Sequence, residues 1–172
     1  MDSKSILEKL AVYLKDAMVV AVFFVVAAVL VNVYKTSSID FDKNHQLNVT
    51  TITGKNINLR DYRGRAVLIQ FWASWCPVCS LEYDSLNNIA EDYPVIGIAL
   101  NSGPLDEVAA FAEERKLLFD IVNDPDAIIG SQFQVSGVPA SFVLDRSGKI
   151  RFVEVGYTSE IGLRARLWWA GL

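Results

Sequence analysis

The chain has two cysteines, Cys76 and Cys79, and their spacing is the strongest sign of chemistry in the sequence. Two thiols three positions apart can exchange with a disulfide in a partner, because one thiolate attacks, a mixed disulfide forms and the second thiol resolves it. In a helical turn Cys79 would lie deeper than Cys76. We therefore predict a redox site in which Cys76 attacks and Cys79 resolves the mixed disulfide.

The residues around the pair indicate how it is positioned. Residues 67–72 are rich in β-branched and aromatic side chains and predict a buried strand, whereas the apolar spacing over 79–90 predicts a helix. Pro77 suits the first position of that helix, because its missing N–H group would have no partner there. Cys76 then lies at the strand-to-helix turn, beside free N–H groups and the positive end of the helix dipole, which favour a thiolate.

Three other roles for a cysteine pair fit the sequence less well. A structural zinc site needs two further Cys or His ligands, and the only histidine, His45, lies far upstream in a polar segment, where we interpret it as a solvated linker residue. Covalent haem attachment requires a histidine directly after the second cysteine, where this chain has Ser80. A static structural disulfide would close a very short loop and constrain the unfolded chain little. We therefore favour a bridge that opens and closes during function.

An apolar segment near the N-terminus has the length of a membrane span. Residues 17–34 are apolar apart from Asn32, and a helix of that length extends about 27 Å, close to the roughly 30 Å hydrocarbon core of a bilayer. A buried core helix is disfavoured because every face is apolar. A cleavable signal peptide is the nearer alternative, but residues 1–16 mix acidic with basic side chains and no small-x-small cleavage site follows. Because no cysteine follows the apolar run, lipid attachment there is excluded, and we predict an uncleaved signal anchor.

The chain is therefore expected to comprise a cytoplasmic N-terminal segment (1–16), a transmembrane signal anchor (17–34), a linker (35–46) and one globular domain (47–172). Three lysines precede the span and two follow shortly after it, which favours the N-terminus in the cytoplasm and the domain outside. A cysteine pair in an oxidising compartment must be kept in its working redox state by a partner.

Strand and helix patterns alternate along the domain, which predicts an α/β fold with a parallel core. A hairpin is expected over 47–59, and the later strands and helices at 67–72, 79–90, 94–100, 105–117, 119–122, 126–133, 141–144, 150–155 and 159–169. The pair Trp168-Trp169 is interpreted as a core anchor, with a contact for a partner as the alternative.

The charge of the domain argues against nucleic acid as a partner. Residues 36–172 hold 12 Lys or Arg and 17 Asp or Glu, a formal charge of −5. No stripe of basic residues and no phosphate-binding glycine loop is visible along the sequence.

Two stretches together resemble the thioredoxin superfamily: Phe71-Trp-Ala-Ser-Trp-Cys-Pro-Val-Cys79 and Gly137-Val-Pro-Ala-Ser-Phe142. The apolar anchor, the leading hairpin and Leu59-Arg-Asp-Tyr-Arg-Gly64 are similar to the TlpA, ResA and DsbE group of membrane-tethered thioredoxin-like proteins. Residues 158–170 resemble the suppressor-of-copper-sensitivity D branch of that group. The resemblance implies a thioredoxin-like fold, with a central mixed sheet flanked by helices and an N-terminal hairpin.

The resemblance also implies roles for residues around the cysteines. Pro139 matches the family's cis-proline, which would pack beside the pair and leave the Val138 carbonyl to bind a substrate backbone; a plain strand-start proline is the alternative. Trp75 matches the aromatic residue that precedes the nucleophile and shields it from water. With Pro77 and Val78 between the cysteines, these residues form the expected substrate contact.

Two departures from the family pattern affect the expected chemistry. Cytosolic thioredoxins have a buried aspartate where this chain has Gln70, which cannot titrate, so another base is needed. Glu82 matches an active-site glutamate of the cytochrome-maturation members, and we hypothesise that it accepts the Cys79 proton; a solvated first-turn acid is the alternative. The dipeptide Pro77-Val78 lacks the histidine of strong oxidants, which favours a potential in the reducing range of roughly −200 to −270 mV over about −120 mV.

The sequence thus predicts an extracytoplasmic thiol–disulfide oxidoreductase, anchored in the bacterial inner membrane with its domain in the periplasm. It is expected to reduce disulfides in exported proteins, in a role like cytochrome c maturation or copper tolerance, with electrons from a membrane thiol–disulfide donor. We expect a monomer without cofactor or metal. The alternatives are a disulfide-forming oxidase or isomerase, and a non-catalytic Cu(I)-binding dithiol, which no methionine or histidine cluster supports. Peroxide reduction fits poorly, since peroxide-reducing relatives lack this cysteine pair in the turn.

Overall fold

The computed structural model describes the domain and a few positions before it, namely residues 13, 15, 16, 18–20, 22, 23 and 47–172. The described positions before residue 24 are helical and exposed. The predicted cytoplasmic segment, the anchor over 17–34 and the linker with His45 lie wholly or largely outside the described residues. Within the part of the chain that is described, no helix has both the length and the apolar character needed to cross a membrane.

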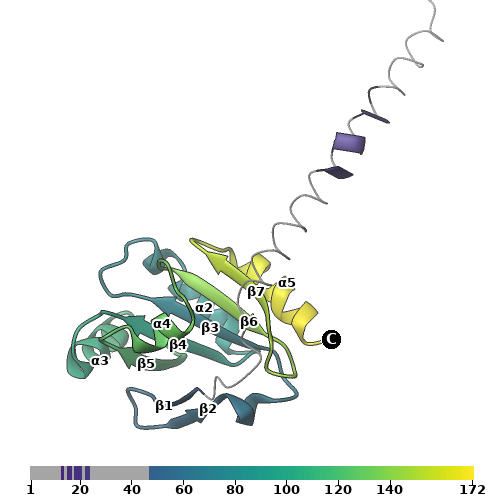
Figure 1. The fold of residues 1–172 in the computed structure, drawn as a ribbon. Helices are drawn as coiled ribbons and strands as arrows, with labels where there is room; N and C mark the ends of the chain where they lie inside the picture. The colour runs from purple at the N-terminus through teal and green to yellow at the C-terminus, as the bar shows by residue number, and fades with distance from the viewer. Residues whose placement is uncertain (1–12, 14, 17, 21, 24–46) are drawn as a thin grey trace, which may run out of the picture. The chain divides into compact units, whose positions relative to one another are not determined.

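A five-stranded mixed sheet forms the centre of the domain, in the order β5-β4-β3-β6-β7 (Figure 1). Its strands are β3 (Val67–Trp72), β4 (Val95–Leu100), β5 (Asp120–Asp124), β6 (Ala140–Leu144) and β7 (Ile150–Val155). β3 pairs parallel with β4 and antiparallel with β6, while β4–β5 is parallel and β6–β7 antiparallel. Every residue of β3 and β4 is buried, as expected for strands covered on both faces.

Helices and a hairpin cover the two faces of the sheet. The remaining elements are β1 (Asn48–Thr50), β2 (Asn56–Asn58), η1 (Leu59–Tyr62), η2 (Cys79–Leu81), α2 (Tyr83–Ala90), α3 (Leu105–Glu114), α4 (Ile128–Gln132) and α5 (Glu160–Ala170). Buried residues of α2, α3 and α5 pack in one core cluster, whereas α4 and the β1–β2 hairpin contribute to the cluster on the other face. The expected thioredoxin-like architecture, with helices flanking a mixed sheet, is confirmed.

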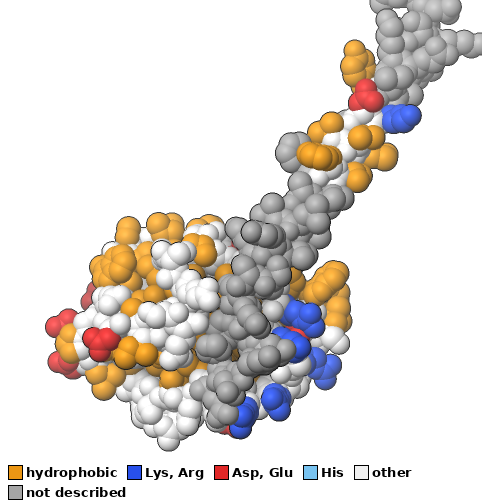
Figure 2. All heavy atoms as spheres, viewed as in Figure 1, with side chains coloured by type: hydrophobic (Ala, Val, Ile, Leu, Met, Phe, Trp, Pro, Cys, Tyr) orange, Lys and Arg blue, Asp and Glu red, His pale blue; other side chains and the backbone are white. Residues whose placement is uncertain are grey.

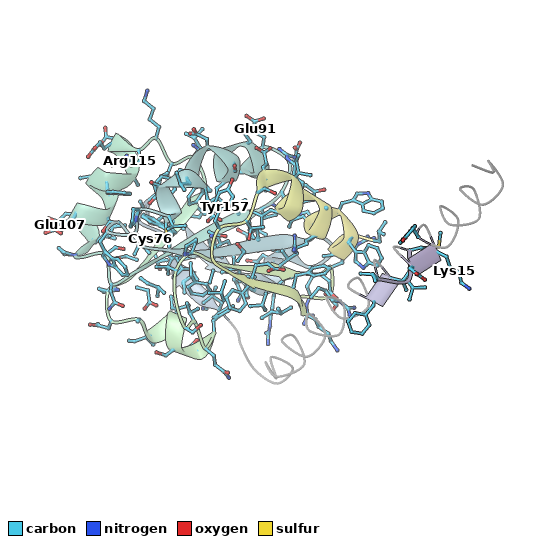
Figure 3. All side chains as sticks on the ribbon, turned by 90° about the horizontal axis from the view of Figure 1, so that it is seen from above. Lys15, Cys76, Glu91, Glu107, Arg115 and Tyr157 are labelled. Carbon is cyan, nitrogen blue, oxygen red and sulfur yellow. A yellow bond between two sulfur atoms is a disulfide. The ribbon has the colours of Figure 1, made fainter. Side chains whose placement is uncertain are left out.

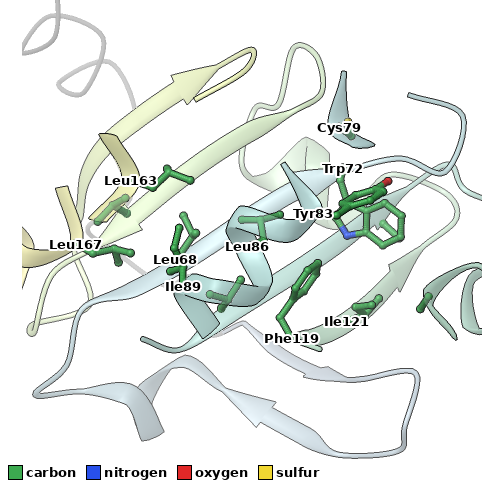
Figure 4. Packing of buried hydrophobic residues seen from close by; sticks show 14 of the residues in the cluster. Leu68, Trp72, Cys79, Tyr83, Leu86, Ile89, Phe119, Ile121, Leu163 and Leu167 are labelled. Atoms are coloured by element: carbon green, nitrogen blue, oxygen red, sulfur yellow. The ribbon is translucent and has the colours of Figure 1, made fainter. Parts of the chain in front are cut away.

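The larger cluster surrounds one face of β3 (Figure 4). Leu68 and Trp72 point to this face because side chains alternate along a strand, and they meet apolar residues of α2 and α5. Trp72 also stacks on Phe111 of α3, with ring centroids 5.7 Å apart, and packs edge-on against Tyr83. This packing fixes the end of β3 from which the cysteine loop departs.

Two expectations about the helices were wrong. The helix expected over 79–90 is a 3-10 turn, η2, followed by α2, and the change of phase buries Tyr83 and leaves Leu81 exposed. Trp168 and Trp169 are not a core anchor: they are 59% and 66% exposed. The buried stripe of α5 runs through Leu163, Leu167 and Ala170 at helical spacing, so its two tryptophans project from the opposite side.

The core leaves no room for a side chain at Gly97. A Cβ built on Gly97 collides with Phe119 and stands 2.9 Å from Trp72 Nε1. We expect Gly97→Ala to lower the free energy of unfolding by about 1–3 kcal/mol, because overpacking forces neighbouring side chains out of their preferred positions. Urea unfolding of the oxidised protein measures this. Gly137→Ala, where a Cβ meets nothing within 4 Å, is the control, and equal midpoints for the two variants would contradict the prediction.

Candidate active site

The cysteine pair lies in the loop that follows β3, at the end of the sheet (Figure 3). Cys76 and Cys79 form a disulfide, with their Cα atoms 5.4 Å apart. Cys76 is 6% exposed and Cys79 only 1%, so Cys79 is the deeper of the two, as predicted, while their roles as attacking and resolving cysteine stay predictions. The Cys79 N–H points at Cys76 Sγ at 3.2 Å, which would stabilise a Cys76 thiolate once the disulfide is reduced.

The segment before β6 completes the site from the other side of β3. Phe71 pairs with Ala140 across the β3–β6 ladder, and this register brings Val138 and Pro139 beside the cysteines. The Val138–Pro139 peptide bond is cis, and Cys76 Sγ lies 3.7 Å from Val138 O. The Pro139 carbonyl is already used, since it accepts a hydrogen bond from the Gly156 N–H (2.8 Å). Of these two carbonyls, that of Val138 faces the sulfur and that of Pro139 is bound by Gly156.

The loop and turn that carry the two cysteines also carry three exposed apolar side chains. Trp75 is 63% exposed, Val78 40% and Leu81 66%. Trp75 is held in place because its Nε1–H donates to Asn101 O (3.0 Å). Leu81 was not among the substrate contacts expected from the sequence. We name Trp75, Val78 and Leu81 the apolar rim. They offer a surface on which an unfolded or flexible substrate segment could lie.

Behind the disulfide, Glu82 takes part in a buried chain of hydrogen bonds. The side chain is 1% exposed, so the alternative of a solvated first-turn acid is wrong. Gln70 Nε2 donates to Glu82 Oε2 (3.0 Å), and the Thr158 N–H donates to Glu82 Oε1 (2.7 Å). The Ser141 hydroxyl donates to Gln70 Oε1 (2.6 Å), and this bond orients the amide so that its NH₂ group faces the carboxylate.

This environment brings the titration of Glu82 close to neutral pH. Burial raises the pKa of the Glu82 carboxyl to about 7, and the hydrogen bond from the Thr158 N–H opposes part of that rise. A carboxyl with a pKa near 7 can exchange a proton with a thiol under physiological conditions. Its position at the first residue after η2 is compatible with the hypothesised role as proton acceptor for Cys79.

Gln70 and Ser141 were not expected to act together. They come from β3 and β6, which lie far apart in the sequence, and are opposite one another in the β-ladder. The absence of an aspartate at Gln70 is the only signal that the sequence offers, and nothing in the sequence indicates Ser141 or Thr158. Among the described residues, no cluster of three or more His, Cys, Asp or Glu side chains could hold a metal ion.

We expect Gln70→Leu to raise the pKa of Glu82 further, because the variant loses the donor to Glu82 Oε2. A hydrogen bond to a charged group contributes about 1.5–3 kcal/mol, which corresponds to about one to two pKa units. The pKa of Glu82 is measured from the midpoint of the pH dependence of the free energy of unfolding of the oxidised protein. Gln132→Leu, on the exposed end of α4, is the control. If Gln70→Leu had the same midpoint of this pH dependence as the unmodified protein, the Gln70 amide would not stabilise the Glu82 carboxylate.

Comparison with known proteins places this chain in the class of thioredoxin-like thiol–disulfide oxidoreductases of the ResA and DsbE type. The family model described as AhpC/TSA matches residues 38–153, and the chain belongs to this family.

The relatives carry names that agree with the class. The thiol-disulfide oxidoreductase ResA of Geobacillus thermodenitrificans is 30% identical over 123 residues, which cover 69% of this chain and 71% of the relative. The thioredoxin-like protein YneN of Bacillus subtilis is 29% identical over 126 residues, or 70% and 74% of the two chains. A secreted Mycobacterium tuberculosis disulfide oxidoreductase homologous to E. coli DsbE superposes with a TM-score of 0.63 at 26% identity, over 72% of this chain and 96% of that one.

Proposed function

We propose that this oxidoreductase works as a membrane-tethered reductase of disulfides in exported proteins. The anchor over 17–34 would hold it in the bacterial inner membrane with the domain in the periplasm, and a membrane thiol–disulfide donor would return it to the dithiol state. The observation that carries the proposal is the apolar rim beside Cys76 and the Val138 carbonyl, since together they can hold an extended substrate segment against the sulfur.

The reaction begins with the Cys76 thiolate attacking one sulfur of a substrate disulfide. A bond forms between Cys76 Sγ and that sulfur, and the other substrate sulfur leaves as a thiolate that takes a proton from water. Glu82 then accepts the Cys79 proton, and the Cys79 thiolate attacks Cys76 Sγ. This attack breaks the bond between Cys76 Sγ and the substrate sulfur, which leaves as a thiolate and takes a proton from water, and the enzyme is left with the Cys76–Cys79 disulfide. Two electrons have passed from the enzyme dithiol to the substrate disulfide, and the donor must supply two to restore it.

The equilibrium reduction potential of the cysteine pair tests the direction of electron flow. Because no histidine stands between Cys76 and Cys79, we expect a value below about −200 mV in glutathione buffers. A value near −120 mV would identify an oxidase and overturn the proposed reductase. Introducing histidine as Val78→His is the matched variant, and it should raise the potential.

A further inference from the structure

Basic side chains gather at two turns that the fold brings together. They are Arg60, Arg63, Arg65, Arg146, Lys149 and Arg151, in or beside η1 and the β6–β7 turn, and we name this set the basic pole. Two hydrogen bonds join the turns, from the Gly64 N–H to Arg146 O (2.8 Å) and from Arg146 Nε to Gly64 O (3.1 Å). All six basic side chains are exposed. The two turns also contain Asp61 and Asp145, so six positive and two negative charges leave a formal +4.

The rest of the domain has the opposite charge. Residues 47–172 hold 11 Lys or Arg and 15 Asp or Glu, a formal −4, so the part outside these turns carries −8. Figure 2 shows Lys and Arg gathered over the β6–β7 turn and the C-terminal end of α5, with acidic side chains at the distant edge over α3. Among the described residues, Arg60, Arg63, Arg65 and Arg146 have no acidic side chain at ion-pair distance. Their charges are therefore available to an anionic partner.

Large apolar side chains adjoin the basic pole. At the end of α5 three of them are exposed: Trp168 (59%), Trp169 (66%) and Leu172 (76%). This helix end abuts the start of β3, since a Cβ at Gly171 would lie 3.9 Å from the Cβ of Ala66, the neighbour of Arg65. Tryptophan is enriched at bilayer surfaces, where its indole lies among the headgroups. Basic side chains are attracted to anionic lipid, and arginine is well suited to binding phosphate groups.

The basic pole and the cysteine pair lie at opposite ends of β3. Arg65 precedes this strand and Cys76 follows it, and six residues of strand extend about 20 Å. β6 is antiparallel to β3 with Leu144 opposite Val67, so the β6–β7 turn lies at the same end as Arg65. A surface bound to the basic pole would leave the active site facing away from it.

The N-terminal part of the chain joins the domain at this same end. Leu47 O accepts a hydrogen bond from the Leu59 N–H (3.2 Å), so the chain enters the domain beside η1. The preceding linker, residues 35–46, can extend at most about 40 Å. A bilayer that held the anchor would thus remain within reach of the basic pole. The short tether would raise the effective concentration of the bilayer surface at the basic pole.

We propose that the basic pole, together with Trp168, Trp169 and Leu172, binds the surface of an anionic phospholipid bilayer. The inference rests on the signal anchor of the proposed function to bring the domain to a membrane. Binding would turn Cys76 away from the lipid, where soluble exported proteins can reach it, and the membrane donor of the proposed function would have to present its thiols above the bilayer surface. An acidic protein partner would use the arginines as well, but it leaves the two exposed indoles beside them without a role.

The test uses the full chain reconstituted into vesicles of phosphatidylcholine, alone or with about a third phosphatidylglycerol, with bromine on the phosphatidylcholine acyl chains. The bromine quenches the fluorescence of tryptophans that lie in the bilayer surface. The docking signal is the difference in quenching between the unmodified protein and Trp168→Phe/Trp169→Phe. We expect it in the anionic vesicles only, and we expect high salt to abolish it because salt screens surface charge. Arg63→Gln/Arg65→Gln should weaken docking about 25-fold, at about fivefold for each arginine. Arg115→Gln/Lys116→Gln removes equal charge from the distant end of α3 and should change nothing.

The outcomes separate docking from anchoring, because vesicle flotation is measured on the same samples. If the protein floats with both kinds of vesicle, the anchor is supported. If the quenching is then equal in both kinds or absent from both, the docking surface is overturned. Flotation with anionic vesicles alone supports the docking surface and removes the anchor. Flotation with neither overturns both. The reduction potential of the cysteine pair is independent of these results.

Discussion

Replacing Cys79 with serine is expected to trap a mixed disulfide between Cys76 and the substrate, whereas Cys76→Ser is expected to trap nothing. Cys79 is 1% exposed and lies behind Cys76, so an external disulfide can reach only the first sulfur. Without the second thiol, the mixed disulfide has no internal route to release. Both variants should lose steady-state reduction of a protein disulfide by at least about a thousandfold, because a hydroxyl cannot replace a thiolate in this exchange.

Mass spectrometry of the products distinguishes the two variants. An oxidised model protein is added to each reduced variant, and the covalent adduct is measured under non-reducing conditions. Ser80→Ala, directly after the pair and exposed, serves as the control and should turn over normally. An adduct on Cys76→Ser with none on Cys79→Ser would reverse the assignment of attacking and resolving cysteines.

Glu82 should make the oxidised protein less stable as the pH rises from about 4.5 to about 7. Burial raises the pKa of this carboxyl in the folded state to about 7, above its ordinary value of 4.5. Between these two values the folded protein holds a proton that the unfolded chain has lost, so the free energy of unfolding falls with pH. The stabilising contribution is fully present below about pH 4.5 and is lost through pH 7. Its size is about 3.5 kcal/mol, at about 1.4 kcal/mol for each pKa unit.

Denaturant unfolding across this pH range measures the effect, and Glu82→Gln should remove the slope between pH 4.5 and 7. The absolute stability of that variant is less informative, since its new NH₂ group must face one of the two donors, Gln70 or Thr158. Glu91→Gln, an exposed acid at the end of α2, is the matched control. A slope that persists in Glu82→Gln would assign the titration to another group.

The same variant tests the role of Glu82 in the reaction. A base acts when it is deprotonated, so the rate of thiol exchange in the unmodified protein should rise as the pH passes about 7. Glu82→Gln should lack this limb of the profile while the Cys76 attack remains. Identical pH profiles for the two proteins would remove Glu82 from the proton transfer.

Local sequence patterns were sufficient for most of the fold. The run of β-branched and aromatic residues at 67–72 predicted β3 with its bounds, and the alternation that follows predicted the order of strands and helices. The phase of the helix after Cys79 was not predictable, because the apolar spacing over 79–90 does not distinguish a regular helix from a 3-10 turn followed by a helix; in the fold Tyr83 packs edge-on against Trp72. That single change buried Glu82 and exposed Leu81.

Features assembled from distant segments were less accessible to sequence reasoning. The hydrogen bond between Ser141 and Gln70 exists only because β6 lies beside β3 in one register. The basic pole was missed for the same reason, since its arginines come from two turns about eighty residues apart and no stripe is visible in the linear sequence. Long-range pairing, which a single sequence does not specify, decides both.

The fixed position of Trp75 gives this protein an optical property of its own. Its indole is anchored to Asn101 O and belongs to the residue next to Cys76, on the exposed side of the disulfide. A disulfide beside an indole quenches the fluorescence of the indole, and two thiols quench it less efficiently. The emission of Trp75 should therefore brighten on reduction and dim on oxidation, so that each turnover of the enzyme can be followed in real time without an added dye.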